Sequence, residues 1–486
     1  MKFETPYLHM GVAAIQLVEE IKILGLTIDR KLTFNTHVAN ICRKAANLYK
    51  LLARSAKISW GLNPEVVRTI YVAVIEPTIL YAASVWAAAA SKITVQKQLN
   101  AIQRGFAQKI CKGYRTISLN AALILAGILP LDLRVQEAAT FYEAKRGRPL
   151  EHLEGGDMAD REIEEKECFL NALHPASEED IEFQCLENTD PQTLEEYHID
   201  GNMIFTDGSK IEGKVGAALS RWLDGGEVEY KKFKLEPYCS VFQAELFALW
   251  RAVEMASAHK VTNILSDSRS SLELLKNQKE FHPLAVKIRK TLRKLRTQNK
   301  TVKLFWIRAH VGVAGNERAD ELAKEAALKL KVKSHYDRCP TSFVKNRIRQ
   351  STVAKWDQRY QEGTTAATTK VFLPDARMAY RFVRKAKFTP TMVQVMTGHG
   401  GFADYLCRFK LRTDAGCFCD PDIKQDIWHI LLDCPKFGKK RFELEMQIDE
   451  QLKKENLNKI LFNNNSRVPF TNFCTTVAKY IAGLNK

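Results

Sequence analysis

Short apolar runs alternating with one long amphipathic stretch predict an α/β domain at about residues 201–330. The runs at 203–206 and 263–266 each lead through a hydroxyl residue to an aspartate, Asp207 or Asp267, as buried strands that end in turns do. Further strands are expected at 216–222, 229–235 and 302–307, the first two joined by a hairpin turn at Asp224-Gly225-Gly226. Aspartates just past the carboxyl ends of strands lie where open α/β sheets form binding sites.

Apolar positions within 242–256 recur at intervals of three and four residues, which predicts a helix with one buried face. Glu245 lies at the edge of that face, so its carboxylate either extends into solvent or points inward at a cation. Two more helices are expected at 269–277 and 284–297. The second either contacts nucleic-acid phosphates or forms a solvated face over its apolar residues. Its basic residues are Lys287, Arg289, Lys290, Arg293, Lys294 and Arg296.

A glycine-containing loop that carries His310 leads into a last predicted helix, which Asn316 is expected to cap and which places Asp320 just past its first turn. Four carboxylates could then converge at one end of the sheet: Asp207, Glu245, Asp267 and Asp320. Such a cluster is strongly repulsive unless cations neutralise it. Oxygen ligands without nearby cysteines or a histidine cluster favour Mg²⁺ or Mn²⁺, and two such ions suit phosphodiester hydrolysis.

The chain is basic, with a formal net charge of +17, which indicates either a polyanionic partner such as nucleic acid or simply a solvated basic surface. Its hydrophobic fraction of 45% is that of a folded globular protein. The longest apolar stretches, such as 79–90, are shorter than the roughly 18 residues that a membrane span needs. The first residues lack the apolar core of a secretory signal. We therefore expect an intracellular protein, in the nucleus or cytoplasm, that is neither secreted nor associated with a membrane.

Uneven charge divides the chain into four predicted regions. Residues 151–200 are strongly acidic and contain glycines and prolines, which is typical of a solvated linker. Residues 1–150 are expected to be mainly helical after a strand-like segment at 21–29. The α/β domain follows at 201–330, and residues 331–486 form a basic C-terminal region.

A cluster of thiols and one imidazole distinguishes the C-terminal region, at Cys417, Cys419, His429 and Cys434. Three thiolates and an imidazole can close a tetrahedral zinc site, and closed sites of this type are usually structural. The single residue between the first two cysteines is a shorter gap than usual, so four reduced residues of an ordinary fold are the alternative. Cys407 or His399 could replace one of these ligands.

The motifs Thr-Asp207-Gly-Ser, Gln-Ala-Glu245-Leu, Ser-Asp267-Ser and Arg-Ala-His310-Val-Gly-Val-Ala-Gly-Asn-Glu-Arg-Ala-Asp320 together resemble a type 1 ribonuclease H domain. The resemblance implies a five-stranded mixed sheet with flanking helices, and an endoribonuclease that hydrolyses the RNA strand of RNA–DNA hybrids. Asp207 and Asp267 would bind the metal ion that activates water, and Asp207, Glu245 and Asp320 would bind the second ion. His310 would assist proton transfer or product departure, and Ser209 and Asn316 would contact the nucleic-acid backbone. Arg308-Ala309 replaces the Pro-Gly of many cellular members, which puts none of these ligands in doubt.

Segments before this domain, at 24–35, 75–86, 102–106 and 126–134, look like the region after the palm in reverse transcriptases of arthropod non-LTR retrotransposons of the jockey kind. The cluster at 417–434 is similar to the Cys-Cys-His-Cys element, or zinc knuckle, of the same polyproteins. The resemblance implies the C-terminal part of such a polyprotein, in which residues 1–150 are a remnant of the post-palm or thumb region.

No Tyr-Ala-Asp-Asp motif occurs in the sequence, so we expect no polymerase activity. The expected partners are RNA–DNA hybrids and other nucleic acid, and the sequence identifies no protein partner. Two alternatives to an active ribonuclease remain, namely a catalytically silent nucleic-acid-binding protein and a non-functional transposon remnant.

Overall fold

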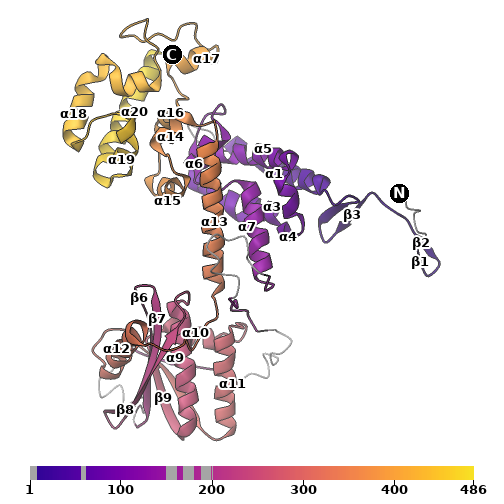
Figure 1. The fold of residues 1–486 in the computed structure, drawn as a ribbon, viewed down its shortest axis with the longest axis vertical. Coiled ribbons are helices and arrows are strands. Elements are labelled where there is room, and N and C mark those ends of the chain that lie inside the picture. Colours follow the sequence, from indigo (N-terminus) through magenta and orange to yellow (C-terminus); the bar gives the residue numbers. More distant parts are fainter. Residues whose placement is uncertain are drawn as a thin grey trace. The chain divides into compact units, whose positions relative to one another are not determined.

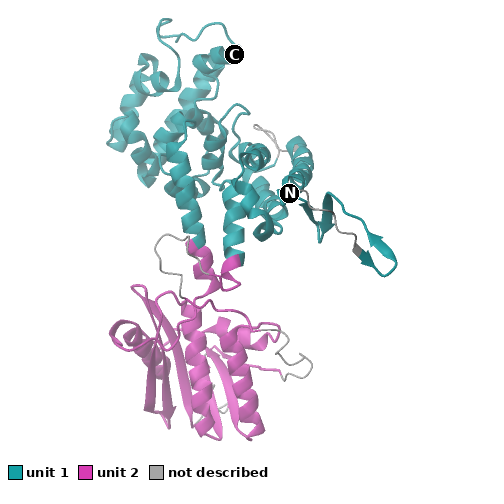
Figure 2. Ribbon diagram, turned by 45° about the vertical axis from the view of Figure 1, so that its right-hand side comes forward, with its two compact units in different colours: residues 1–142, 348–486 teal, residues 143–347 magenta. Residues whose placement is uncertain are grey.

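The computed structural model describes residues 8–55, 62–148, 161–167, 180–187, 197, 199 and 201–485. The chain divides into two compact units, which Figure 2 distinguishes by colour. Unit 1 combines residues 1–142 with residues 348–486, and unit 2 consists of residues 143–347. Most of the predicted acidic linker, including its glycine pair at 155–156 and its two prolines, lies outside the described residues. The four predicted domain boundaries therefore stay a prediction.

A six-stranded mixed sheet forms the centre of unit 2, with strands in the order β5-β10-β9-β6-β7-β8. Figure 1 labels four of these strands, β6 to β9. The strands are β5 (Gln184–Leu186), β6 (Met203–Ile211), β7 (Lys214–Leu223), β8 (Gly226–Leu235), β9 (Val261–Ser266) and β10 (Thr301–Ile307). β6, β7 and β8 form an antiparallel meander, whereas β9 pairs in parallel with both β6 and β10. The mixed sheet expected from the sequence is confirmed. Asp224 and Gly225 both have positive φ, which matches the predicted hairpin turn between β7 and β8.

The sixth strand, β5, was not expected, because it comes from the acidic stretch taken as a linker. It pairs in parallel with β10, and its last residue, Leu186, is buried. Three residues with one buried apolar side chain give too short a pattern for a periodicity argument to detect. Another described part of the stretch packs against the rest of unit 2, since a Glu164 carboxylate oxygen lies 3.0 Å from His282 Nε2.

In the described part of unit 2, this sheet is flanked by helices α9 (Val241–Met255), α10 (Arg269–Lys276), α11 (Pro283–Thr297) and α12 (Ala314–Lys329). α9 begins with a capping box in which the side chains of Ser240 and Gln243 satisfy each other's backbone N–H groups. The expectation that Asn316 caps the last helix is wrong. α12 begins three residues earlier than expected, after Val313, so Asn316 lies inside its first turn and Asp320 lies in its second turn.

Unit 1 is mainly helical after two short hairpins, as the sequence predicts for its first part. The hairpin strands are β1 (Leu8–Met10), β2 (Ala13–Ile15), β3 (Glu20–Ile23) and β4 (Leu26–Asp29). The helices before unit 2 are α1 (Asn35–Ser55), α2 (Pro64–Ile70), α3 (Glu76–Leu80), α4 (Ala83–Trp86), α5 (Ile93–Cys111), α6 (Leu119–Ala126) and α7 (Leu131–Ala144). Those after it are α13 (Thr341–Glu362), α14 (Ala367–Phe372), α15 (Ala376–Ala386), α16 (Pro390–Thr397), α17 (Ala403–Arg408), α18 (Gly438–Ile448), α19 (Leu457–Phe462) and α20 (Asn464–Leu484).

A single hydrophobic core joins the two chain segments of unit 1. It includes Trp86 and Phe106 from the first segment and Trp356 and Phe470 from the second, all fully buried. Within the described residues no single helix is long and apolar enough to cross a bilayer, whereas two bent pairs, 64–80 with 83–91 and 119–126 with 131–144, meet that test by length and composition alone.

Candidate active site

Strand register places Asp207 beside Asp267. The parallel pairing of β6 with β9 ends at Thr206 opposite Ser266. The next residue is Asp207 after Thr206 and Asp267 after Ser266, so the two aspartates are neighbours. Asp267 follows the end of β9, as predicted. Asp207 instead lies inside β6, because that strand continues along β7 as far as Ile211 after its pairing with β9 has ended. The aspartate therefore occupies the point at which the parallel part of the sheet stops.

Glu245 reaches the two aspartates because α9 packs unusually close to β6. A Cβ atom at Gly208 would lie 2.5 Å from the backbone nitrogen of Glu245, so only glycine permits this approach. The oxygens of Asp207, Glu245 and Asp267 can all lie within 4.8 Å of one another. Glu245 is 9% exposed, and its Oε2 atom is buried with no hydrogen-bond partner in the described part of the chain. Of the two alternatives left open by the sequence, its carboxylate points inward.

Burial and mutual repulsion raise the pKa values of these three carboxyls. Burial, together with the charges of Asp267 and Asp320, raises the pKa of Asp207 to about 7. Burial and the neighbouring Asp207 raise the pKa of Glu245 well above its usual value. Burial also raises the pKa of Asp267, although a hydrogen bond from Asn316 and the positive charge of a protonated His310 oppose that effect. Each carboxylate would regain its ordinary acidity if a cation were bound among them.

The fourth predicted carboxylate, Asp320, belongs to a neighbouring group at the edge of the cluster. Its ligand atom lies within 4.8 Å of those of His310 and Glu317, while its charge raises the pKa of Asp207. Lys324, one turn further along α12, donates a hydrogen bond of 2.5 Å to Asp320 Oδ2. Neither Glu317 nor Lys324 was predicted from the sequence as part of the site. Their spacing of three and four residues from Asp320 on a helix was the available signal, but surface helices carry such pairs routinely.

The remaining predicted residues lie around this cluster. Asn316 is 3% exposed and donates from Nδ2 to Asp267 Oδ2 at 3.3 Å, so it fixes the orientation of that carboxylate. His310 is exposed and has a φ of 55°, which holds it on a turn beside the acidic group. Ser209 is half-buried two residues after Asp207 on β6, so both side chains lie on the same face of the sheet.

The donor set fits divalent metal ions that prefer oxygen. Several carboxylates converge, no cysteine joins them, and one buried carboxylate oxygen of Glu245 has no partner among the described residues. Mg²⁺ and Mn²⁺ prefer such carboxylate ligands, and a bound cation would satisfy the orphaned oxygen. The carboxylate cluster is therefore chemically suited to the Mg²⁺ or Mn²⁺ ions expected from the sequence.

Comparison with known proteins agrees with this geometry. Residues 200–328 match the family model described as RNase H. The chain therefore carries a ribonuclease H domain. Two solved structures are similar to it at low overall TM-scores. RNase H1 from Halobacterium salinarum NRC-1 has 25% identity and a TM-score of 0.22, covering 26% of this chain and 96% of the other. The N-terminal RNase H domain of rv2228c from Mycobacterium tuberculosis has 21% identity and a TM-score of 0.23, and the match covers 26% of this chain and 94% of the other.

Curated relatives come from R1 retrotransposable elements. A 115 kDa protein of the type-1 element R1DM of Drosophila melanogaster is 32% identical over 185 residues, which is 36% of this chain and 18% of the relative. The Pol polyprotein of the element R1 4 of Nasonia vitripennis is 28% identical over 172 residues, which is 35% of this chain and 43% of the relative. The matches span less than half the length of these relatives. They confirm the resemblance to a non-LTR retrotransposon polyprotein that contains a ribonuclease H domain.

One of the basic residues of α11 that were predicted to contact nucleic acid cannot do so in this structure. Arg289 is buried, and its guanidinium donates hydrogen bonds to the carbonyls of Leu274, Leu275 and Asn277 near the end of α10. Its role is therefore to satisfy a helix C-terminus rather than to contact phosphate. The contact of the other basic side chains with phosphates stays a prediction.

The Cys/His cluster in unit 1 assembles as expected. Ligand atoms of Cys417, Cys419, His429 and Cys434 lie within 4.8 Å of one another. Backbone hydrogen bonds from Cys417 to Ile423 and from Gln425 to Ala415 close a hairpin that carries the first two cysteines. The Cys419 Sγ atom lies 3.1 Å from His429 Nε2. The suggested substitutes do not join the cluster, because the Cys407 thiol faces the Thr413 carbonyl and His399 bonds to Thr116.

Proposed function

We propose that the ribonuclease H domain is an endoribonuclease that hydrolyses the RNA strand of RNA–DNA hybrids. The convergence of Asp207, Glu245 and Asp267 around a buried, unpartnered carboxylate oxygen is the observation that carries this proposal. Such a cluster is costly for a folded protein unless it serves to bind cations. A chain that had lost its function would be free to replace any of these acids, so their joint presence favours an enzyme over a silent binding protein or a remnant.

Each acidic residue has a proposed role. Asp207 and Asp267 would hold the first of two Mg²⁺ or Mn²⁺ ions, and Asp207, Glu245 and Asp320 would hold the second. When bound, such a pair of ions supplies an activated water and a stabilised leaving oxygen. Asn316 keeps the Asp267 carboxylate oriented through its hydrogen bond.

His310 and Ser209 act toward the substrate in this proposal. The exposed His310 imidazole would carry a proton to the departing oxygen or assist release of the product. Ser209, on the same face of β6 as Asp207, would contact the backbone of the hybrid together with Asn316. Recognition of the 2′-hydroxyl and of the shape of the groove would make cleavage specific for RNA but indifferent to base sequence.

Cleavage of a labelled RNA–DNA hybrid by the purified chain tests this function. We expect cutting with Mg²⁺ that stops with a chelator and that spares single-stranded RNA and duplex DNA. Asp267→Asn should lower the rate more than about a hundredfold, because loss of a ligand exceeds loss of its supporting partner, while binding of the hybrid is retained. Asp224→Asn, in the distant hairpin turn, is the matched control and should cut normally. Tight binding without cutting by the unaltered chain would instead favour the silent binding protein.

We further propose one structural Zn²⁺ at Cys417, Cys419, His429 and Cys434. The converging ligand atoms support it, as does the hydrogen bond of 2.8 Å from the His429 backbone N–H to Asp426, which positions the start of the turn carrying the imidazole. A closed set of three thiolates and one imidazole leaves no position for substrate, so the ion would stabilise the fold of this element.

A further inference from the structure

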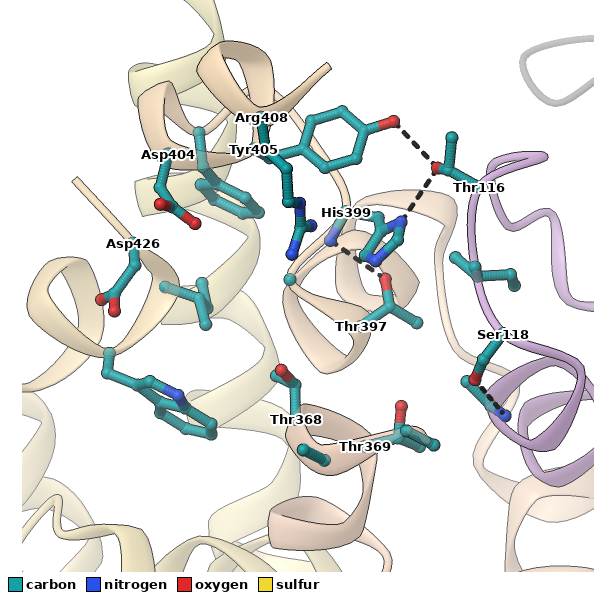
Figure 3. Close-up of a pocket in the computed structure, with 18 of the residues that line it drawn as sticks. Thr116, Ser118, Thr368, Thr369, Thr397, His399, Asp404, Tyr405, Arg408 and Asp426 are labelled. Carbon is teal, nitrogen blue, oxygen red and sulfur yellow. Dashed lines mark hydrogen bonds between the residues drawn. The ribbon is translucent and has the colours of Figure 1, made fainter. Parts of the chain in front are cut away.

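A polar cavity of about 380 Å³ lies in unit 1 (Figure 3). Its lining includes residues 426–428, which directly precede His429 of the Cys/His cluster in the sequence. One wall comes from residues 116–121, at the start of α6, and the other from residues between 364 and 428. Protein interiors are close-packed, and cavities of this size that combine apolar walls with a few convergent polar groups are usually binding sites. The ribonuclease function proposed above does not involve this cavity, because the acidic cluster belongs to unit 2.

Hydrogen bonds between the two walls hold the cavity in one shape. The Thr116 hydroxyl lies 2.9 Å from both His399 Nδ1 and the Tyr405 hydroxyl, which joins segments almost 300 residues apart. The His399 and Tyr405 rings pack at 5.1 Å between centroids. Burial, with a smaller effect of Arg408, lowers the pKa of His399 to about 4, so the imidazole is neutral at physiological pH. The site is therefore preorganised, which reduces the entropy lost when a ligand binds.

Several polar side chains face this cavity without strong protein partners. Figure 3 shows Asp404, Arg408 and Thr368 turned toward the cavity. Among the described residues Asp404 has one ion pair, a contact of 3.9 Å with a Lys424 side chain that is 76% exposed. Arg408 is exposed and lies over aromatic rings rather than in an ion pair. Asp426 provides a second carboxylate on the lining, although its Oδ1 atom already accepts a hydrogen bond of 2.8 Å from the His429 backbone N–H.

The combination of carboxylates and a guanidinium at this cavity disfavours ligands that carry charge of one sign only. Two carboxylates disfavour a bare anion, and a guanidinium beside them disfavours a bare cation. A ligand that offers N–H donors to the carboxylates and an anionic group to the arginine satisfies both. An unpaired nucleotide has this chemistry, because its base carries exocyclic amine hydrogens and its backbone carries a phosphate. The neutral His399 and the Tyr405 ring provide apolar and aromatic surface for the base.

We propose that this cavity binds one unpaired base of a single-stranded nucleic acid and prefers bases that carry an exocyclic amine. The Asp404 carboxylate accepts hydrogen bonds from the amine, with the Thr368 hydroxyl beside it. The exposed Arg408 binds the adjoining phosphate at the mouth of the cavity. The chain thereby has a base-selective site in unit 1 that is separate from the ribonuclease H domain.

Binding of fluorescent oligo-dC and oligo-dT to the full chain, followed by anisotropy at neutral pH without added Mg²⁺, tests this proposal. Both strands are DNA, so ribonuclease activity does not affect the result, and dT lacks the exocyclic amine. We expect oligo-dC to bind about tenfold more tightly, the value of one good base contact. Asp404→Asn should reduce that preference to nearly one, whereas Asp422→Asn, an exposed aspartate that does not line the cavity, should preserve it.

A second pair of variants separates the phosphate contact from the base contact. Arg408→Gln should weaken both strands equally and reduce the slope of log affinity against log salt by about one. Lys439→Gln changes a side chain on α18 that is 91% exposed, and it should alter neither the affinities nor the salt dependence. If Asp404→Asn does not fold, Thr368→Val replaces it and should weaken oligo-dC but not oligo-dT. Equal binding of the two strands by the unaltered chain, a retained preference in Asp404→Asn, or no binding at all would each overturn the proposal.

Discussion

Asp207 is the residue at which burial and charge conflict most directly, and this conflict predicts a pH dependence of stability. Its pKa is raised to about 7 in the folded protein, whereas an unfolded chain has the ordinary value of about 4. Between these values the folded state holds a proton that the unfolded state has lost, so stability falls as pH rises from about 4 to about 7. Above pH 7 the metal-free domain should stay at its lower stability, and Mg²⁺ should restore it.

Differential scanning calorimetry with and without a chelator measures this effect. The transition that Mg²⁺ raises identifies the ribonuclease H domain within the full chain. With the chelator its midpoint should fall as pH increases through the window. Asp207→Asn, which cannot ionise, should flatten much of that fall and weaken the response to Mg²⁺. A midpoint that rises with pH in the metal-free protein would contradict the argument.

Individual residues of the candidate site were not equally predictable from the sequence. The motifs of Asp207, Glu245 and Asp267 are recognisable, because each residue follows a short apolar run or lies on a patterned helix face. The inward direction of Glu245 did not follow, because it depends on how closely α9 approaches Gly208, a contact between distant segments. The capping role expected of Asn316 was wrong for a similar reason. Its side chain bonds to Asp267 across the domain rather than to its own helix.

At the level of elements, α12 carries a cation that competes for a proposed metal ligand. Lys324 donates to Asp320, and the same spacing recurs five residues later where Lys329 donates to Glu325 at 3.0 Å, remote from the predicted acidic quartet. Lys324→Met should therefore tighten Mg²⁺ binding about two- to fivefold, since a partly exposed pair of this kind contributes up to about 1 kcal/mol. Lys329→Met should leave it unchanged. Titration calorimetry of the two variants measures the difference, and equal affinities would show that Lys324 does not compete.

The hairpin and turn that carry Cys417, Cys419, His429 and Cys434 should depend on zinc for their structure. Cys417→Ser should release the ion and lower the thermal midpoint of unit 1, because the energy of a structural metal is part of the folding energy. Cys407→Ser is the matched control, since that thiol lies outside the cluster. Elemental analysis of both purified variants gives the zinc content. Zinc retained at the same stoichiometry after Cys417→Ser would remove that residue from the ligand set.

The elements themselves were predictable where pattern and turn chemistry agree. β7, β8, their hairpin turn and the helices α9 to α11 all lie within three residues of the expected bounds, because each has its own apolar period. β6 instead continues five residues beyond its expected end, because it goes on pairing with β7. β5 was missed because its three residues gain stability from pairing with β10 rather than from their own pattern. Local periodicity cannot reveal an element that exists only through its neighbour.

At the scale of the whole molecule, the helices before and after the ribonuclease H domain share one core. Residues 1–150 and 331–486 were predicted as separate regions, because local sequence patterns do not indicate which distant surfaces pack together. Asp132, almost fully buried, pairs with Arg359 at 2.8 Å, and Glu137 pairs with Arg349 at 2.8 Å. Loss of the second segment would leave Asp132 without Arg359 and would expose the core surface that the two segments share, although Glu137 would keep its pair with Arg134 at 2.6 Å. The first segment should therefore not remain folded without the second.

Truncation after residue 347 tests this dependence. α6 is apolar all round, with residues 121–126 buried, and it packs against α15 of the second segment. Without that segment α6 should be exposed, so limited proteolysis should cut within 119–126 under conditions that leave the full chain intact. Residues 201–330 should resist digestion equally in both proteins, because the ribonuclease H domain has its own core, and they serve as the internal control. Protection of α6 in the truncated chain would mean that residues 8–142 fold independently and that their contacts with the second segment are dispensable.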